Sequence, residues 1–248
     1  MSYALITGAS SGIGREFAHL LEQKGYDLIL VARREELLNE LKNELKCDVV
    51  VLPYDLSVED NCKELIEKIK EYNISIFINN AGYGECGYIM STSYEKELNM
   101  IDLNIRCVYI LTKMMLSIMK KGHILNVASV AGLLPAGPYM SQYYATKAYV
   151  RSLSEGINYE LRKNKSNIYV SALCPGPVDT EFNDVANVKF ALKGISAKKC
   201  VTYAYKKMMK NKTIIVPTFK LRLALFSQRF ISRKCAIKIA AHQQQKKM

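Results

Sequence analysis

The chain has 248 residues, 49 % of them hydrophobic, which is enough for one large α/β domain or two small ones and excludes a disordered protein. No basic stretch precedes the first apolar run and no run of about 18 apolar residues occurs, so neither a signal peptide nor a spanning helix is expected. The seven cysteines are scattered and never form a CxxC pair, which favours reduced thiols in the cytoplasm over disulfides or a metal site.

The net charge of +12 is concentrated in the last quarter of the chain. Residues 185–248 contain 16 lysines and arginines and no Asp or Glu, whereas residues 1–184 carry 19 basic and 23 acidic side chains. The excess positive charge is therefore confined to the C-terminal quarter of the chain, and its explanation has to lie in that segment.

Short apolar runs alternate with longer segments of helical period, such as Glu35–Leu45 and Glu59–Tyr72. This alternation predicts right-handed βαβ crossovers and a single doubly wound α/β domain, with a seven-stranded parallel sheet and helices on both faces. No linker or repeat precedes residue 219, so residues 1–218 are expected to form the domain and 219–248 a helical extension of it. The expected strands are Tyr3–Thr7, Asp27–Ala32, Asp48–Leu52, Ile74–Asn79, Gly122–Ala128, Asn167–Leu173 and Thr213–Val216.

The first strand runs into a glycine-rich loop and then into a helical segment. A turn this tight needs residues without Cβ, and its amides and the helix dipole can approach a pyrophosphate closely. Glycines also mark ordinary turns, but the strand before and the helix after favour a dinucleotide site. The spacing GxxxGxG resembles that of the short-chain dehydrogenase/reductase family, whose fold is the Rossmann fold. The resemblance implies that the cofactor-binding residues of this loop are Gly8, Ser10, Ser11, Gly12, Ile13 and Gly14.

The second strand ends in Ala32, followed by Arg33 and Arg34. In a dinucleotide fold this position faces the adenosine ribose, where an acidic residue would bind the 2′-hydroxyl. Two arginines instead favour a 2′-phosphate through charge-assisted hydrogen bonds, so NADP(H) is the expected cofactor. The alternative is that both arginines are solvated residues at the start of a helix.

Three further segments match the cofactor pattern of the family, although each alone would also fit a helix cap or a turn. The resemblance implies that Asp55 and Leu56 hold the adenine and that the NNAG segment at 79–82 stabilises the sheet and lines the adenosine pocket. It also implies that the loop after the sixth strand holds the nicotinamide carboxamide. The residues assigned by these matches are Asn80, Ala81, Gly82, Pro175, Gly176, Val178 and Thr180.

Tyr143 and Lys147 lie four positions apart, so on a helix they share one face. A nearby ammonium is expected to lower the pKa of the tyrosine toward the working range of a general acid or base. Ser129 follows the fifth strand, where ligands gather in this fold, and its hydroxyl can donate to a substrate oxygen. The resemblance adds Asn104 as part of a proton relay, and makes Lys147 a ligand of the nicotinamide ribose.

These residues predict hydride transfer between the nicotinamide and a small-molecule alcohol or carbonyl, with Tyr143 as acid or base. The first alternative is an epimerase of the extended branch of the superfamily. Such a chain usually adds a substrate domain, and 248 residues are few for that. A non-catalytic NADP(H)-binding regulator, or a redox sensor at a membrane surface, would not need Asn104, Ser129, Tyr143 and Lys147 together. Residues 182–197 are expected to form an apolar substrate loop, and the family implies a homo-oligomer.

The basic tail from Phe219 to His242 has Leu221, Leu225, Phe230 and Ile237 near helical spacing, with basic residues between them. This pattern predicts a basic amphipathic helical segment. Such a segment could associate with an anionic membrane surface, cover the edge of the sheet, form a dimer interface, or bind an acidic partner. Nucleic acid is not an expected partner because no recognised binding motif or aromatic interleaving is present.

Overall fold

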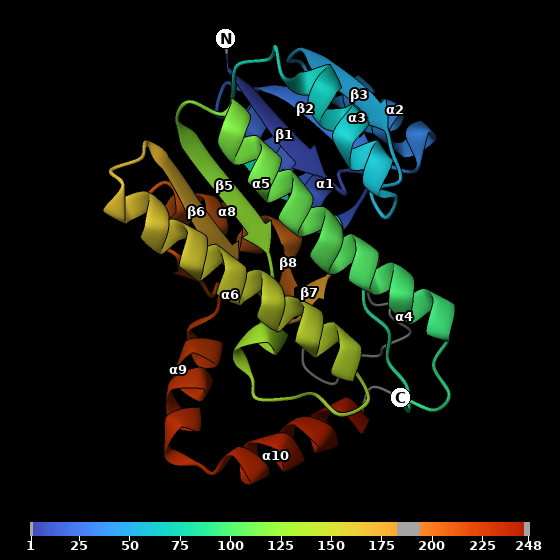
Figure 1. Cartoon of the computed structure of the whole chain (residues 1–248), viewed down its shortest axis with the longest axis vertical. Coiled ribbons are helices and arrows are strands. Elements are labelled where there is room, and N and C mark those ends of the chain that lie inside the picture. Colours follow the sequence, from blue (N-terminus) through green and yellow to red (C-terminus); the bar gives the residue numbers. More distant parts are fainter. Residues whose placement is uncertain (1, 183–193, 246–248) are drawn as a thin grey trace.

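The computed structural model describes residues 2–182 and 194–245 (Figure 1). Its centre is a parallel sheet with the strand order β3-β2-β1-β4-β5-β6-β9, which confirms the predicted seven-stranded parallel sheet. A two-stranded sheet of β7 and β8, which the sequence did not predict, follows β6 in the chain. The strands are β1 Tyr3–Thr7, β2 Asp27–Ala32, β3 Val49–Pro53, β4 Ile74–Asn79, β5 Gly122–Val127, β6 Ile168–Leu173, β7 Val178–Asp179, β8 Ile195–Ser196 and β9 Ile214–Ile215.

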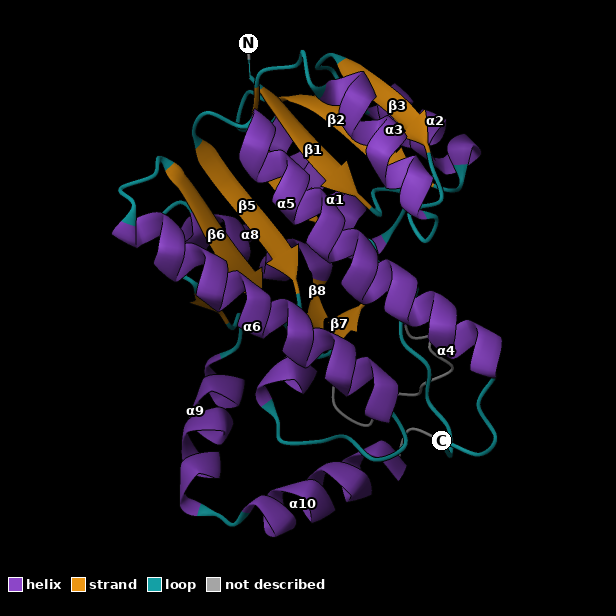
Figure 2. Ribbon diagram, in the orientation of Figure 1, coloured by secondary structure: helices purple, strands orange, loops and turns teal. Residues whose placement is uncertain are grey.

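Helices cover both faces of the sheet (Figure 2). Successive strand residues point to opposite faces. Leu28 and Leu30 of β2 therefore pack with α1, α2 and α8, whereas Ile29 and Val31 pack with α3, α5 and α6. A sheet buried on both sides needs such unbroken apolar strands. The helices are α1 Gly12–Glu22, α2 Glu35–Glu44, α3 Glu59–Ile69, α4 Tyr94–Ile101, α5 Val108–Ile118, α6 Ser141–Lys163 and α8 Ala197–Met208.

A buried polar network joins β4, β5, α5 and α6 near the carboxyl end of the sheet. Asn126 Oδ1 accepts hydrogen bonds from Asn79 Nδ2 and from Thr112 Oγ1, both at 3.1 Å. Asn126 Nδ2 donates to Ser154 Oγ at 3.0 Å, and Ser154 donates in turn to the Val150 carbonyl. All four polar side chains are fully buried. Because buried amides and hydroxyls are costly to leave unpaired, the network fixes the relative positions of these elements.

The chain ends in what we call the C-terminal arm, residues 219–245. It consists of α9 (Phe219–Ser227), a 3₁₀ turn at Gln228–Phe230 and α10 (Arg233–Gln245). Figure 1 places it beyond the carboxyl ends of the strands. Among residues 2–182 and 194–245, no helix is long and apolar enough to cross a bilayer.

The prediction of a single amphipathic face is wrong for α9. Leu221 and Leu225 pack inward on the core, but Leu223 and Phe226 of the same helix are exposed on its other side. Phe230, which was grouped with Leu221 and Leu225 by its spacing, is 77 % exposed. The 3₁₀ turn at 228–230 breaks the helical register, so that a spacing counted through the turn no longer marks one face.

Replacing Asn126 by leucine tests the buried network. The substitution keeps the branching of the side chain at Cγ but removes the three hydrogen bonds that Asn126 makes with Asn79, Thr112 and Ser154, so we expect the free energy of unfolding to fall by about 2–4 kcal/mol. Urea denaturation measures this change. Asn43→Leu on the exposed side of α2 is the matched control and is expected to have little effect. An equal loss in both variants would contradict the role given to the network.

Candidate functional site

A cavity of about 420 Å³ opens at the carboxyl ends of the central strands. It is bordered by the turn after β1, the ends of β2, β4 and β5, the start of α6 and the loop after β6. Two of the residues singled out from the sequence, Gly14 and Asn104, do not line it. Those that line it are Gly8, Ser10, Ser11, Gly12, Ile13, Arg33, Asp55, Leu56, Asn80, Ala81, Gly82, Ser129, Tyr143, Lys147, Pro175, Gly176, Val178 and Thr180.

The glycines of the first turn are required by its geometry. Gly8 and Gly12 have φ values of +63° and +54°, a left-handed conformation that other residues adopt only with strain. A Cβ on Gly14 would lie 2.2 Å from the Gly8 carbonyl oxygen, so this glycine lets α1 begin directly against the turn. Gly14 therefore shapes the cavity without lining it. The result is a cradle of backbone at the amino end of a helix, which suits a phosphate group.

The NNAG segment holds this turn against β4. Asn80 Nδ2 donates to the carbonyl oxygens of Thr7 and Gly8, at 3.0 and 3.1 Å. Thr7 Oγ1 in turn accepts from the backbone amides of Asn80 and Ala81, at 2.9 and 3.1 Å. Thr7 was not singled out from the sequence, because a threonine at a strand end carries no signal of its own. These four hydrogen bonds make the ends of β1 and β4 one rigid wall of the cavity.

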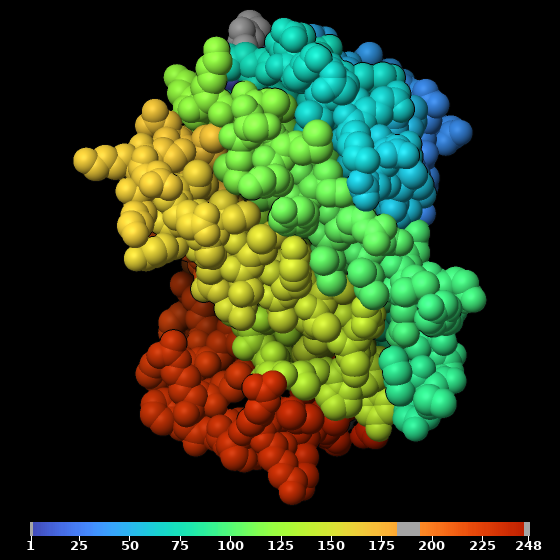
Figure 3. All heavy atoms as spheres, viewed as in Figure 1, coloured from blue at the N-terminus to red at the C-terminus, as the bar shows by residue number. Residues whose placement is uncertain are grey.

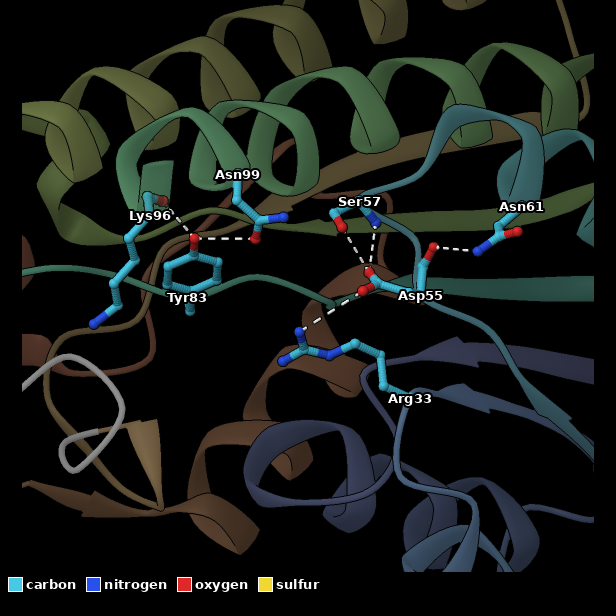
Figure 4. A network of polar contacts seen from close by, with 7 residues as sticks. All are labelled: Arg33, Asp55, Ser57, Asn61, Tyr83, Lys96 and Asn99. Atoms are coloured by element: carbon cyan, nitrogen blue, oxygen red, sulfur yellow. Dashed lines mark hydrogen bonds and ion pairs between the residues drawn. The ribbon is translucent and has the colours of Figure 1, made fainter. Parts of the chain in front are cut away.

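Arg33 and Arg34 both border the cavity beside Asp55. Figure 4 shows Arg33 reaching toward Asp55, with 3.8 Å between Arg33 Nη1 and Asp55 Oδ2. Asp55 Oδ1 accepts from the amide and the hydroxyl of Ser57, at 2.9 and 2.7 Å. Arg34 donates to Ser10 Oγ and pairs with Glu181. The Arg33 and Arg34 side chains are 65 % and 50 % exposed, so both are accessible to a ligand in the cavity.

Ser129, Tyr143 and Lys147 come together in the same cavity. Ser129 lies two residues beyond the end of β5, where it accepts from the amide of Ala131 and caps a 3₁₀ turn. Lys147 Nζ donates to the Val127 carbonyl at 2.9 Å and lies 5.8 Å from the centre of the Tyr143 ring. The three side chains are buried. Spacing of four on α6 therefore does place tyrosine and lysine on one face, as expected.

Burial shifts the pKa values of this pair in opposite directions. Desolvation raises the pKa of Tyr143 to about 12, although a hydrogen bond with Ser129 lowers it. Desolvation also lowers the pKa of Lys147 from 10.5 to about 8. The expectation that the lysine lowers the pKa of the tyrosine does not hold for the protein alone, because removal from water outweighs the other influences. At neutral pH, Tyr143 is therefore a protonated phenol that can act as a proton donor.

Asn104 lies behind the cavity in a π-helical turn. Residues 102–107 form this turn between α4 and α5, and π turns are frequent at functional sites. Asn104 Oδ1 accepts from the Tyr83 amide at 3.1 Å, while its Nδ2 donates to the Tyr83 carbonyl at 2.8 Å and to Thr146 Oγ1 at 3.1 Å. A Cβ on Gly82 would lie 2.7 Å from Asn104 Oδ1 and 3.3 Å from Lys147 Nζ. Asn104 thus joins the chain after β4 to α6, close to the lysine.

The family model described as short chain dehydrogenase matches residues 2–189. This chain belongs to the short-chain dehydrogenase family. An uncharacterised oxidoreductase of Staphylococcus saprophyticus is 38 % identical over 188 residues, which are 73 % of this chain and 75 % of that protein.

Solved structures of the family superimpose on most of the chain. A short-chain dehydrogenase from Sphingobium yanoikuyae in complex with NADPH has a TM-score of 0.80 at 32 % identity, covering 93 % of this chain and 94 % of the other. A short-chain dehydrogenase/reductase from Burkholderia phymatum in complex with NAD has a TM-score of 0.84 at 25 % identity, covering 92 % and 93 %. The fold expected from the resemblance is therefore confirmed.

Sequence reasoning missed the part that Tyr144 plays in this short-chain dehydrogenase. Tyr144 borders the cavity, and its hydroxyl is hydrogen-bonded to Gln244 of α10, 100 residues away in the chain. Phe182 packs against the Tyr143 ring at 5.6 Å between centroids. No local pattern marks Tyr144 as a partner of the arm.

Of the predicted substrate loop, Phe182 is described and borders the cavity, while residues 183–193 lie outside the described residues. Among the described residues, no cluster of His, Cys, Asp or Glu could hold a metal ion.

Replacing Lys147 by methionine should stabilise the protein near neutral pH. Because its pKa is lowered to about 8, the folded state disfavours the ammonium form that the unfolded chain carries. The resulting loss in the free energy of unfolding has its full size below pH 8, where both states are protonated. It shrinks as the pH rises from 8 to 10.5 and is absent above 10.5, where both states are neutral. We expect Lys147→Met to raise the free energy of unfolding by about 1–3 kcal/mol at pH 7 and by little at pH 10.5.

Urea denaturation of both proteins at the two pH values measures this difference. Lys163→Met at the exposed end of the same helix is the control and should change stability little at either pH. A variant that is less stable than the native protein at pH 7 would contradict the burial penalty.

Proposed function

We propose that this protein is an NADP(H)-dependent oxidoreductase that moves hydride between the coenzyme and a small-molecule alcohol or carbonyl. The observation that carries the proposal is a single cavity bordered both by the glycine cradle and by Ser129, Tyr143 and Lys147. Membership in the short-chain dehydrogenase family supports oxidoreduction. The complexes of relatives with NADPH and NAD support a nicotinamide coenzyme as the ligand.

The residues present fit a dinucleotide. The turn from Gly8 to Gly14 borders the cavity at the amino end of α1, and Cβ atoms on its three glycines would lie 2.2–3.1 Å from neighbouring atoms, so the chain can follow this tight path only with glycine there. Residues after β3 and β4, including Asp55 and Ala81, border the adjoining space and would hold the adenosine. Val178 and Thr180, after β6, would lie against the nicotinamide.

The preference for NADP(H) rests on the charge at the end of β2. Arg33 and Arg34 stand where an acidic residue would bind the ribose 2′-hydroxyl, and both are exposed at the cavity. On binding, the guanidinium of Arg33 would leave Asp55 and pair with the 2′-phosphate of the coenzyme. Two guanidinium groups are well suited to bind a phosphate through paired hydrogen bonds.

When bound, the coenzyme supplies or accepts the hydride. For reduction of a carbonyl, the protonated phenol of Tyr143 donates its proton to the substrate oxygen, and the Ser129 hydroxyl hydrogen-bonds to the same oxygen as negative charge develops. With coenzyme present, the Lys147 ammonium would donate to the nicotinamide ribose in place of the Val127 carbonyl. It would then lie close enough to Tyr143 to stabilise the phenolate that remains after proton transfer. Asn104 holds the segment after Gly82 in place beside the lysine. Because its pKa is raised, Tyr143 is protonated at neutral pH and holds the proton that it would donate.

Calorimetric titration with NADPH and with NADH tests the coenzyme assignment. We expect NADPH to bind at least about tenfold more tightly, since charge-assisted hydrogen bonds contribute about 1.5–3 kcal/mol. The Arg33→Gln, Arg34→Gln double variant should lose most of this difference by weakening NADPH binding alone. Arg106→Gln, another exposed arginine that does not border the cavity, serves as the control. Equal affinities for both coenzymes in the native protein would overturn the preference.

Replacing Tyr143 by phenylalanine tests the catalytic assignment. With NADPH and a panel of ketones and aldehydes, we expect the rate to fall by about 10²–10⁴-fold, the usual contribution of a positioned acid. NADPH affinity should remain close to that of the native protein. Tyr144→Phe, the neighbouring tyrosine in the same cavity, should keep most of the activity. Native turnover by Tyr143→Phe would show that another group supplies the proton.

A further inference from the structure

α9 carries apolar side chains on two opposite sides, with Lys220 and Arg222 between them, but the fold buries only one of the two apolar sides. Leu221 and Leu225 pack against the core. On the other side Phe219 is 69 % exposed, and Leu223 and Phe226 are each 55 % exposed. A surface helix of a globular protein normally turns its apolar residues toward the core and its polar residues toward water, and the outer side of α9 departs from this pattern. The outer side of α9 is therefore suited to a second apolar environment.

The exposed apolar side chains continue past the end of α9. The Phe226 and Phe230 rings meet edge to face with 5.6 Å between their centroids, and Phe230 is 77 % exposed. Ile231, just before α10, and Ile239, in the middle of α10, are also exposed, by 40 % and 52 %. Contiguous exposed apolar patches of this kind mark interaction sites rather than ordinary surface.

Arginines lie directly over these rings. Arg222 stacks on Phe219 at 5.5 Å, and Arg229 stacks on Phe226 at 5.8 Å. Such pairs keep the charged heads at the edge of the apolar patch, where they can contact anions while the rings enter an apolar phase. Exposed lysines border the same surface at positions 220, 234 and 238. Within residues 2–182 and 194–245, no Lys or Arg of the arm forms an ion pair with an acidic side chain.

We propose that the outer face of the C-terminal arm binds an anionic lipid bilayer. The aromatic and aliphatic side chains would enter the boundary between headgroups and acyl chains, and the basic side chains would contact lipid phosphates. A second copy of the chain would fit less well, because an interface between two identical arms would bring two basic surfaces together. Figure 3 shows the arm as a ridge that stands out from the body of the molecule, so it can reach a flat surface.

The arm is also fixed to the body, so that its outer face is presented in one orientation. A Cβ on Gly176 would lie 2.3 Å from Leu221 Cδ1, which shows how closely α9 approaches the loop after β6. Arg233 donates to the Pro135 carbonyl at 3.1 Å, and Gln245 donates to the Tyr139 hydroxyl at 2.8 Å. The arm is therefore a preformed surface and does not have to fold on binding.

Flotation of the full-length protein with vesicles tests the proposal. We expect binding to phosphatidylcholine vesicles that contain phosphatidylglycerol, and little binding to phosphatidylcholine alone. Binding should weaken at high salt, because the Debye length falls from about 10 Å at 0.1 M to about 3 Å at 1 M. Absence of the native protein from the floating fraction of anionic vesicles would overturn the proposal.

Paired variants separate the arm from the total charge. Arg229→Gln with Lys234→Gln should weaken the partition onto anionic vesicles about 30-fold, from about 1 kcal/mol for each basic residue at the surface. Lys120→Gln with Lys121→Gln removes the same charge before β5, at the opposite end of the sheet from the arm, and should have little effect. An equal loss in both pairs would mean that net charge, rather than the arm, causes binding, and would overturn the proposal.

The apolar contribution has its own variants. Phe226→Ser with Phe230→Ser should weaken vesicle binding at least about tenfold. Tyr94→Ser on α4 is the control, because Tyr94 is an exposed aromatic residue outside the arm, and it should leave vesicle binding unchanged. If the phenylalanine variants instead change only the sedimentation of the protein, the surface joins copies of the chain and the proposal fails. If an acidic protein binds the arm and anionic vesicles do not, it also fails. Vesicle binding is independent of coenzyme binding and turnover, so failure of the proposed function would leave this test intact.

Discussion

The hydrogen bonds of Asn126 hold the functional end of this protein together. Its amide connects β4, β5, α5 and α6 in a region from which water is excluded. Asn80 follows the end of β4, Ser129 follows the end of β5, and Tyr143 lies on α6, so the positions of all three depend on this network. A buried amide held by three hydrogen bonds resists small displacements, because each shift leaves a donor or acceptor unpaired.

The same burial gives the cavity its chemistry. Removal from water raises the pKa of the Tyr143 phenol to about 12 and lowers that of the Lys147 ammonium to about 8, so two groups whose ordinary pKa values are close become different in acidity. The lysine also destabilises the folded state at neutral pH. A buried ammonium beside a buried phenol lowers the stability of the fold, and such groups with shifted pKa values are more frequent at functional sites than elsewhere.

The C-terminal arm links two regions that the chain order separates. Its inner side touches Gly176 and Tyr144, which both border the cavity, and its outer side carries the exposed phenylalanines. A ligand on the outer side would therefore bind to an element that packs against residues of the cavity wall. The arm contains no acidic residue, so its charge is not balanced locally and acts outward.

Much of this molecule follows from local patterns in the chain. Unbroken apolar strands such as Asp27–Ala32 predict burial on both faces, and the spacing of Tyr143 and Lys147 on a helix predicts a shared face, because both depend only on the repeat of the backbone. Glycines 8, 12 and 14 mark the turn for the same reason. The contacts of Tyr144 with Gln244, the π turn around Asn104 and the two-sided packing of α9 were not predictable in this way. Each depends on which distant segment comes to lie beside the residue, and that arrangement also determines which groups lose water and therefore how their pKa values shift.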